Sequence, residues 1–301
     1  MDRRSFVEKT LLGAGLVMGA PSLISASPAK RKSGRLTILH TNDTHSNIDP
    51  FPENHAKYPG LGGVARRYDL IQKIRSEEEH VLLLDSGDMF QGTPYFNRFG
   101  GELEMKVMSA MKYDMGTIGN HDFDGTMEGF VKAARYADFP FVCSNYEFTN
   151  TPMEESTRPY QIIERAGMKI GIFGLGVELA GLVPKKLYRE TVYLDPVEMT
   201  QEVVGILRKK GVDMIICLSH LGYSYQSDKI SDLRLAELTE GIDLILGGHT
   251  HTFLEKATPV QNKAGKITLV NQAGWAGIRL GRLDFDLEKK MFHASEGILV
   301  R

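Results

Sequence analysis

The chain has 301 residues, of which 42% are hydrophobic and 9% aromatic, and its formal net charge at pH 7 is −2. This length and composition predict one large domain with a buried core and exclude disorder on the scale of a domain. The slightly acidic balance argues against a partner that is a nucleic-acid polymer.

The N-terminus resembles a twin-arginine export signal, because Arg3-Arg4-Ser5-Phe6 precedes a short apolar stretch rich in Gly, Ala and Ser. We predict a signal peptide over residues 1–29 and export to the periplasm or the exterior. A membrane anchor is the alternative, but the stretch is short and contains Pro21, so we expect no stable anchor. Residues 30–35 are predicted to be a solvated basic linker.

Apolar runs of strand length recur along the remaining chain, at 36–39, 81–84, 170–173, 214–217, 244–246 and 267–270. Helical patterns lie between several of them, at 62–74, 102–111, 126–137 and 196–210. Because strand and helix alternate, the predicted class is α/β. Strand-like pieces at 277–287 and 297–300 add antiparallel edges, so we expect a mixed sheet or two packed sheets.

Five short polar motifs each follow a predicted strand. They are Asp43-Thr44-His45, Gly87-Asp88, Gly119-Asn120-His121-Asp122, Ser219-His220 and Gly247-Gly248-His249-Thr250-His251. Open α/β sheets place their ligands at the carboxyl ends of the strands. Carboxylate, carboxamide and imidazole groups without thiolates suit Mn, Zn, Fe, Mg or Ca. The motifs therefore predict a hydrolytic centre with two divalent metal ions.

Asp88 is the candidate for a carboxylate shared by both ions, because two dications held close together need an anion between them. Asp85 competes for this role, although its position nearer the apolar run fits a structural role better. In Asp-Thr-His and His-Thr-His, an extended backbone would place both ligands on the same side. The pair Gly247-Gly248 allows the backbone to approach the site closely.

His121 follows the candidate ligand Asn120 and would therefore point elsewhere, toward the reacting group. Asp124 could hold its imidazole through a hydrogen bond, so we predict His121 and Asp124 as the catalytic residues. Capping of the following helix by Asp122 or Asp124 is an alternative that can coexist with this role.

Other polar and aromatic residues carry weaker predictions. Cys143 and Cys217 lie in apolar runs and are predicted to be buried free thiols, with a disulfide as the alternative. Trp275 either lines a pocket or packs as an edge aromatic, and packing is favoured. Asn145 is a candidate substrate contact. A loop at 47–60, with three prolines, is expected to form a rim over the site. The remaining histidines are assigned to strand, loop or surface positions: His40, His55, His80 and His293.

The order of the five motifs closely resembles that of the calcineurin-like metallophosphoesterases, and more narrowly the catalytic domain of the 5′-nucleotidase family. The resemblance implies a four-layer αββα sandwich over residues 36–301. It also implies how the two ions are held. Asp43, His45, Asp88 and His251 would bind one ion, and Asp88, Asn120, His220 and His249 would bind the other.

The function implied is hydrolysis of a small phosphorylated substrate, most directly a nucleotide, by in-line attack of a water that bridges the metals. A cyclic-nucleotide or nucleotide-sugar phosphodiesterase is one alternative. A non-catalytic metal- or nucleotide-binding subunit is an alternative from another class. Complete 5′-nucleotidases continue into a C-terminal nucleotide-binding domain that we do not find in this sequence, and a separate polypeptide is a candidate source of it.

Overall fold

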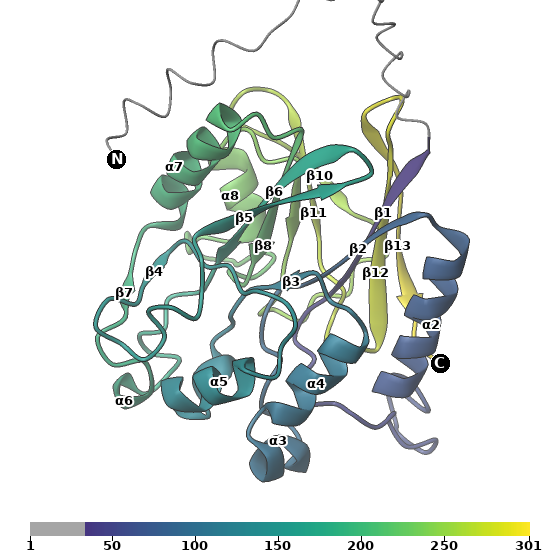
Figure 1. Cartoon of the computed structure of the whole chain (residues 1–301), viewed down its shortest axis with the longest axis vertical. Coiled ribbons are helices and arrows are strands. Elements are labelled where there is room, and N and C mark those ends of the chain that lie inside the picture. Colours follow the sequence, from purple (N-terminus) through teal and green to yellow (C-terminus); the bar gives the residue numbers. More distant parts are fainter. Residues whose placement is uncertain (1–33) are drawn as a thin grey trace, which may run out of the picture. The chain divides into compact units, whose positions relative to one another are not determined.

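A computed structural model describes residues 34–301. The predicted signal peptide and most of the predicted basic linker lie outside the described residues. Two β-sheets stand at the centre of this part of the chain (Figure 1). Between residues 34 and 301 we find no helix with the length and apolar character needed to cross a membrane.

The first sheet has the strand order β13-β12-β1-β2-β3. Its strands are β1 (Arg35–Thr41), β2 (His80–Asp85), β3 (Met115–Gly116), β12 (Arg279–Asp286) and β13 (Met291–Leu299). β1, β2 and β3 are parallel, whereas β12 and β13 add antiparallel strands as predicted. Arg35, which we had placed in the linker, begins β1 and forms an ion pair with Glu78 at 2.7 Å.

The second sheet has the order β10-β11-β9-β8-β6-β5. Its strands are β5 (Tyr160–Arg165), β6 (Met168–Leu175), β8 (Met214–Ser219), β9 (Leu244–Leu246), β10 (Thr258–Gln261) and β11 (Ile267–Asn271). The four inner strands are parallel and the two edges are antiparallel. A separate two-stranded ribbon joins β4 (Tyr146–Glu147) to β7 (Val192–Tyr193).

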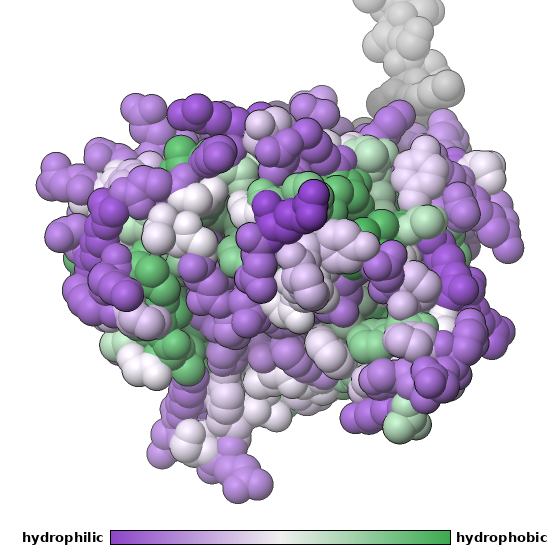
Figure 2. All heavy atoms as spheres, turned by 90° about the horizontal axis from the view of Figure 1, so that it is seen from below, coloured by the Kyte–Doolittle hydropathy of each residue, from purple (hydrophilic) through white to green (hydrophobic). Residues whose placement is uncertain are grey.

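The four predicted helices are present as α2 (Val64–Glu77), α4 (Glu102–Ala110), α5 (Thr126–Ala134) and α7 (Pro196–Lys209). The shorter helices are α3 (Pro94–Phe99), η1 (His121–Phe123), α6 (Lys185–Tyr188) and α8 (Asp232–Leu238). α3, α4 and α5 lie at the bottom of Figure 1, and Figure 2 shows that hydrophilic side chains predominate on this face while its hydrophobic areas are separate.

Alternating apolar side chains on the strands build three cores. On β1, Leu39 packs in the core with α2, α4 and α5, whereas its neighbour Ile38 packs in the core between the two sheets. A third core joins the outer face of the second sheet to Leu207 of α7 and Leu235 of α8. The layers are therefore helix, sheet, sheet and helix, which confirms the predicted four-layer αββα sandwich (Figure 1).

The two cysteines lie in different cores. Cys143 belongs to the core of the first sheet and its helices, and Cys217 belongs to the core between the second sheet and its helices. Both are buried and free, as predicted, and burial raises the pKa of each thiol. At neutral pH they therefore act as small apolar side chains.

His40 makes the stability of the fold sensitive to acid. It is fully buried on β1, and its Nε2 lies 3.2 Å from the amide nitrogen of Asn271, which donates to it. Burial lowers the pKa of His40 from 6.5 to about 3. Below pH 6.5 this histidine is protonated in the unfolded chain but stays neutral in the folded chain. The free energy of unfolding therefore falls as the pH decreases.

We expect this histidine to contribute roughly 1 kcal/mol per pH unit to the loss of unfolding free energy between pH 6.5 and pH 3. Urea unfolding of the unsubstituted chain and of His40→Gln across this range measures the contribution as the difference in slope. The exposed His293 provides a matched control, His293→Gln, for which the slope is expected to be unchanged. Equal slopes for His40→Gln and the unsubstituted chain would contradict the prediction.

Candidate dinuclear metal site

The five polar motifs follow the ends of strands that belong to both sheets. β1 ends at Thr41, β2 at Asp85, β8 at Ser219 and β9 at Leu246, and a candidate ligand lies within three residues of each. The fifth motif follows β3, which ends four residues before Asn120. Because parallel strands present their carboxyl ends on one side of a sheet, these loops meet at one place. The structure brings the side chains together in two adjacent groups.

The first group consists of Asp43, His45 and His251. His251 Nε2 lies 3.3 Å from Asp43 Oδ1, and His45 Nε2 lies 3.8 Å from the same oxygen. The two imidazole nitrogens are 3.1 Å apart. One carboxylate and two imidazoles therefore converge on a space that a single cation can occupy.

The second group consists of Asp88, His220 and His249, with Asn120 beside it. His220 Nε2 lies 3.1 Å from Asp88 Oδ2, and Asn120 Oδ1 lies 2.8 Å from His249 Nδ1. Asp88 Oδ2 is also only 3.8 Å from His45 Nε2 of the first group. Asp88 thus stands between the two groups, where a bridging carboxylate is required.

The donor set fits two divalent cations. His220 Nδ1 donates to the carbonyl of Ser86 at 2.6 Å, and His45 Nδ1 donates to that of Phe90 at 3.2 Å, so Nε2 is the atom that each ring presents to a cation. The buried Nε2 of His220 has no hydrogen-bond partner among the described residues. Burial lowers the pKa of His220, but the nearby charges of Asp88 and Asp43 outweigh it and raise the pKa to about 10. The same negative field favours a bound cation.

The backbone at the ligands is left-handed, and our expectation of an extended backbone is wrong. Five of the predicted ligands have positive φ: Asp43 (49°), His45 (45°), Asp88 (56°), His249 (68°) and His251 (53°). Such conformations cost about 1–3 kcal/mol for a non-glycine residue and persist only where the surroundings enforce them. Tight turns, rather than strand alternation, therefore bring the two ligands of each motif together.

Gly248 lets the backbone approach the site closely, as predicted. A Cβ at this position would lie 2.8 Å from His220 Nδ1 and 2.9 Å from the carbonyl oxygen of Ser86. A side chain there would break the hydrogen bond that orients His220.

Asp122 orders the loop that carries Asp88, a role we had not predicted from the sequence. Its carboxylate accepts backbone N–H hydrogen bonds from Asp88, Met89, Phe90 and Gly119, at 2.8–3.1 Å. It caps no helix, because α5 begins after Gly125 without a side-chain cap. Burial and the charge of Asp88 raise the pKa of Asp122 to about 8, while the four donors favour its ionised form.

We expect Asp122→Ala to lower the unfolding free energy by about 3 kcal/mol or more, because it leaves several buried N–H groups without an acceptor. Urea unfolding of the metal-free chain measures this loss. Asp69→Ala, at an exposed position on α2, is the matched control and should leave the midpoint unchanged. An unchanged midpoint for Asp122→Ala would refute the role of its carboxylate.

Two other polar residues have structural roles. Asp85 is fully buried and accepts hydrogen bonds from Thr41 Oγ1 at 2.6 Å and from the backbone N–H of Gly87 at 2.9 Å. It therefore supports the ligand loops, as predicted, and belongs to neither group. Asn145 is also fully buried and pairs with the backbone of Gly176 in both directions. Our suggestion that Asn145 contacts substrate is wrong.

His121 and Asp124 form the predicted hydrogen-bonded pair on the open side of the site. His121 Nδ1 lies 2.8 Å from Asp124 Oδ2, and this hydrogen bond raises the pKa of His121. The backbone N–H of His121 donates to Asp88 Oδ1 at 2.8 Å, and its ring centroid is 5.3 Å from that of His45. The His121 side chain is 40% exposed, so a ligand at the metal groups can reach it.

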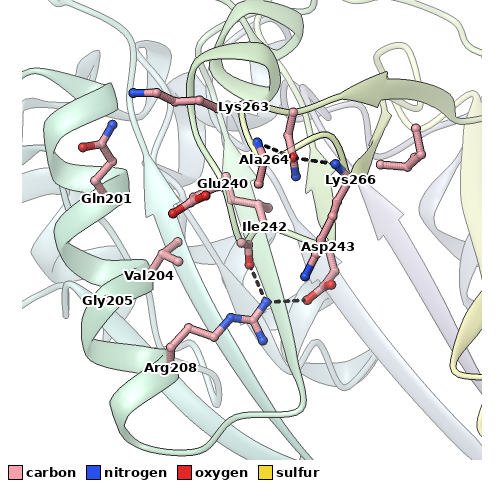
Figure 3. A pocket seen from close by; sticks show the side chains of 13 residues that line it. Gln201, Val204, Gly205, Arg208, Glu240, Ile242, Asp243, Lys263, Ala264 and Lys266 are labelled. Carbon is pink, nitrogen blue, oxygen red and sulfur yellow. Dashed lines mark hydrogen bonds and ion pairs between the residues drawn. The ribbon is translucent and has the colours of Figure 1, made fainter.

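A cavity of about 1020 Å³ lies away from the candidate metal site. It lies between α7, the loop after α8 and the turn that joins β10 to β11 (Figure 3). Arg208, which lines the cavity, donates a hydrogen bond to the carbonyl of Gly241 and forms an ion pair with Asp243. None of the predicted ligands lines this cavity.

A two-sheet sandwich with carboxylate, carboxamide and imidazole ligands at its strand ends defines a metallophosphoesterase. The calcineurin-like phosphoesterase family matches residues 36–253, and the chain belongs to that family.

Among known proteins, snake venom 5′-nucleotidase from Crotalus adamanteus is 35% identical over 279 residues, which cover 86% of this chain and 46% of that protein. The trifunctional nucleotide phosphoesterase protein YfkN of Bacillus subtilis is 33% identical over 87% of this chain and 19% of its own length. The 5′-nucleotidase precursor from Thermus thermophilus has a similar structure, with a TM-score of 0.79, 32% identity, and coverage of 88% of this chain and 54% of that one. This chain thus spans less than half the length of these two curated relatives.

Proposed function

We propose that this protein is an exported phosphoesterase that hydrolyses nucleotides with two divalent metal ions. One observation supports the proposal above the others: Asp88 of the second group lies 3.8 Å from His45 of the first, and its carboxylate accepts a hydrogen bond from the backbone N–H of His121 at 2.8 Å. Metal ligands and a candidate acid are therefore parts of one rigid unit. The relatives named as 5′-nucleotidase and nucleotide phosphoesterase support a nucleotide as the substrate.

The seven predicted ligands would hold the ions in two adjacent positions. When bound, such ions neutralise phosphoryl oxygens and make a water a strong nucleophile at neutral pH. The bound ions would thus supply a water nucleophile for in-line attack on phosphorus, opposite the leaving oxygen. His121 donates a hydrogen bond to a phosphoryl oxygen or to the leaving oxygen, while Asp124 fixes the ring and stabilises its protonated form.

Export through a twin-arginine signal is part of the proposal, supported by Arg3-Arg4-Ser5-Phe6 and the apolar stretch that follows. Replacing both arginines by lysine should leave the full-length chain in the cytoplasm of an expressing bacterium, as measured by cell fractionation. Export of the double variant at the normal rate would refute this route. A separate polypeptide that supplies a nucleotide-binding domain stays a prediction.

The chain freed of residues 1–29 and loaded with Mn, Zn, Fe or Mg should be assayed against mononucleotides, cyclic nucleotides and dinucleotides. Fastest metal-dependent turnover of mononucleotides supports the proposal. Fastest turnover of cyclic nucleotides or dinucleotides would favour the phosphodiesterase instead. Two bound ions with no turnover of any ester would favour the non-catalytic binding subunit.

A further inference from the structure

Trp275 lies directly on one of the candidate metal ligands. Its ring and that of His251 are parallel, with an interplanar angle of 6° and a centroid separation of 5.6 Å. Trp275 therefore packs against aromatic rings, as favoured from the sequence, and one of these rings belongs to the candidate metal site. The His251 side chain is 40% exposed with this contact in place.

His251 differs from the two best-held histidines in how its ring is oriented. His45 and His220 each use Nδ1 to donate to a backbone carbonyl, which is the usual way to orient a metal-binding imidazole. Within residues 34–301, Nδ1 of His251 makes no hydrogen bond of this kind. Among the described residues, the ring of His251 is contacted by the stacked indole and, edge to face, by His45 at a centroid distance of 5.1 Å. The indole is the ring contact that comes from outside the candidate ligands.

Trp275 is in turn held by the long loop before α2. Phe51 and Tyr58 of this loop make edge contacts with the indole, at centroid distances of 5.9 Å and 6.3 Å. The loop is closed at its base by the hydrogen bond from the backbone N–H of Phe51 to the carbonyl of Leu61, at 2.8 Å. Edge-to-face contacts of this geometry stabilise the position of an aromatic ring beyond the burial of its area.

The turn that carries Trp275 is also bonded to the first ligand motif. The backbone N–H of Ala276 donates to the carbonyl of Asp43 at 2.7 Å. Asn42 donates from its side chain to the carbonyl of Gly274 at 2.6 Å and accepts from the backbone N–H of Ala273 at 2.8 Å. The indole therefore has a fixed position relative to Asp43, the carboxylate that His251 faces.

We propose that Trp275 is a positioning residue for His251, and that the aromatic contacts of Phe51 and Tyr58 keep the indole in place. Stacking on the indole here takes the place of the hydrogen bond that orients His45 and His220. The loop at 47–60 thereby acts on the metal site and is more than a rim. This inference rests on the metal site of the proposed function and is independent of the substrate.

The test is metal titration of the metal-free protein, followed by the visible absorption of bound Co²⁺. In Trp275→Leu we expect the affinity for one ion to fall about 10- to 100-fold while the other ion binds normally. Trp275→Phe, which keeps a stacking ring, should restore most of that affinity. Excess metal should restore kcat of the leucine variant without a change in KM. Tyr68→Leu, at an exposed tyrosine of α2, is the matched control.

The inference would be overturned if Trp275→Leu bound both metal ions with unchanged affinity. It would also be overturned if Trp275→Leu and Trp275→Phe lost the same amount of metal affinity. The unfolding midpoint of each metal-free variant separates a local effect from a general loss of stability. If Trp275→Leu does not fold, Tyr58→Ala should show a smaller selective loss at the same ion, and no loss there would overturn the inference. Failure of the unsubstituted chain to bind any divalent ion would instead refute the proposed function.

Discussion

Asp88→Asn should lower metal-dependent turnover about 1000-fold or more. Asp88 stands between the two ligand groups, 3.1 Å from His220 Nε2 and 3.8 Å from His45 Nε2, so its charge serves both ions. Loss of several kcal/mol of charge stabilisation corresponds to this factor, since about 1.4 kcal/mol is tenfold in rate. Elemental analysis should also find fewer than two ions bound per chain. Steady-state hydrolysis of p-nitrophenyl phosphate measures the rate.

Asp228→Asn is the matched control, because the Asp228 side chain is 98% exposed and pairs only with Arg234 among the described residues. This variant should retain full turnover and both ions. Near-normal turnover of Asp88→Asn with two ions bound would contradict the shared role of this carboxylate.

His121→Ala should lower turnover about 100- to 10,000-fold, the usual contribution of a positioned acid or base. The ring lies outside both ligand groups, so metal content should stay at two ions per chain. Asp124→Asn should cause a smaller loss, because it weakens the 2.8 Å hydrogen bond that orients the ring but leaves the imidazole in place.

His293→Ala removes an exposed histidine and should leave the rate unchanged. Turnover and metal content together distinguish a metal ligand from a catalytic residue. A variant of a metal ligand should lose both turnover and bound metal, whereas a variant of His121 or Asp124 should lose only turnover. Retention of near-normal turnover by His121→Ala with both ions bound would refute the catalytic pair.

The geometry of the ligands could not be predicted from the sequence. We expected Asp43 and His45 to share a side because strands alternate, but the chain turns into a left-handed conformation at both residues. Sequence spacing does not distinguish these two cases, because the turn is enforced by contacts from distant segments. One such contact is the hydrogen bond from the backbone N–H of Asp43 to the carbonyl of Gly87, at 2.9 Å.

The role of Asp122 was hidden for a similar reason. Its carboxylate accepts from the backbone of residues 88–90, more than 30 positions earlier in the chain. Backbone N–H groups leave no mark in a sequence, so the local interpretation as a helix cap was the natural one. In the same way, nothing near Trp275 in the sequence indicates that its ring stacks on His251.

The α/β class, the positions of the main strands and helices, and the polar motifs at the strand ends could all be predicted from the sequence, because apolar periodicity and motif order are properties of the chain alone. The tertiary structure was needed to show that six of the seven candidate ligands form two groups with Asn120 beside one of them, that Asp88 lies close to both groups, and that Asn145 is structural. These features depend on contacts between segments far apart in the chain, whose directions follow from packing of the two sheets and from strained turns.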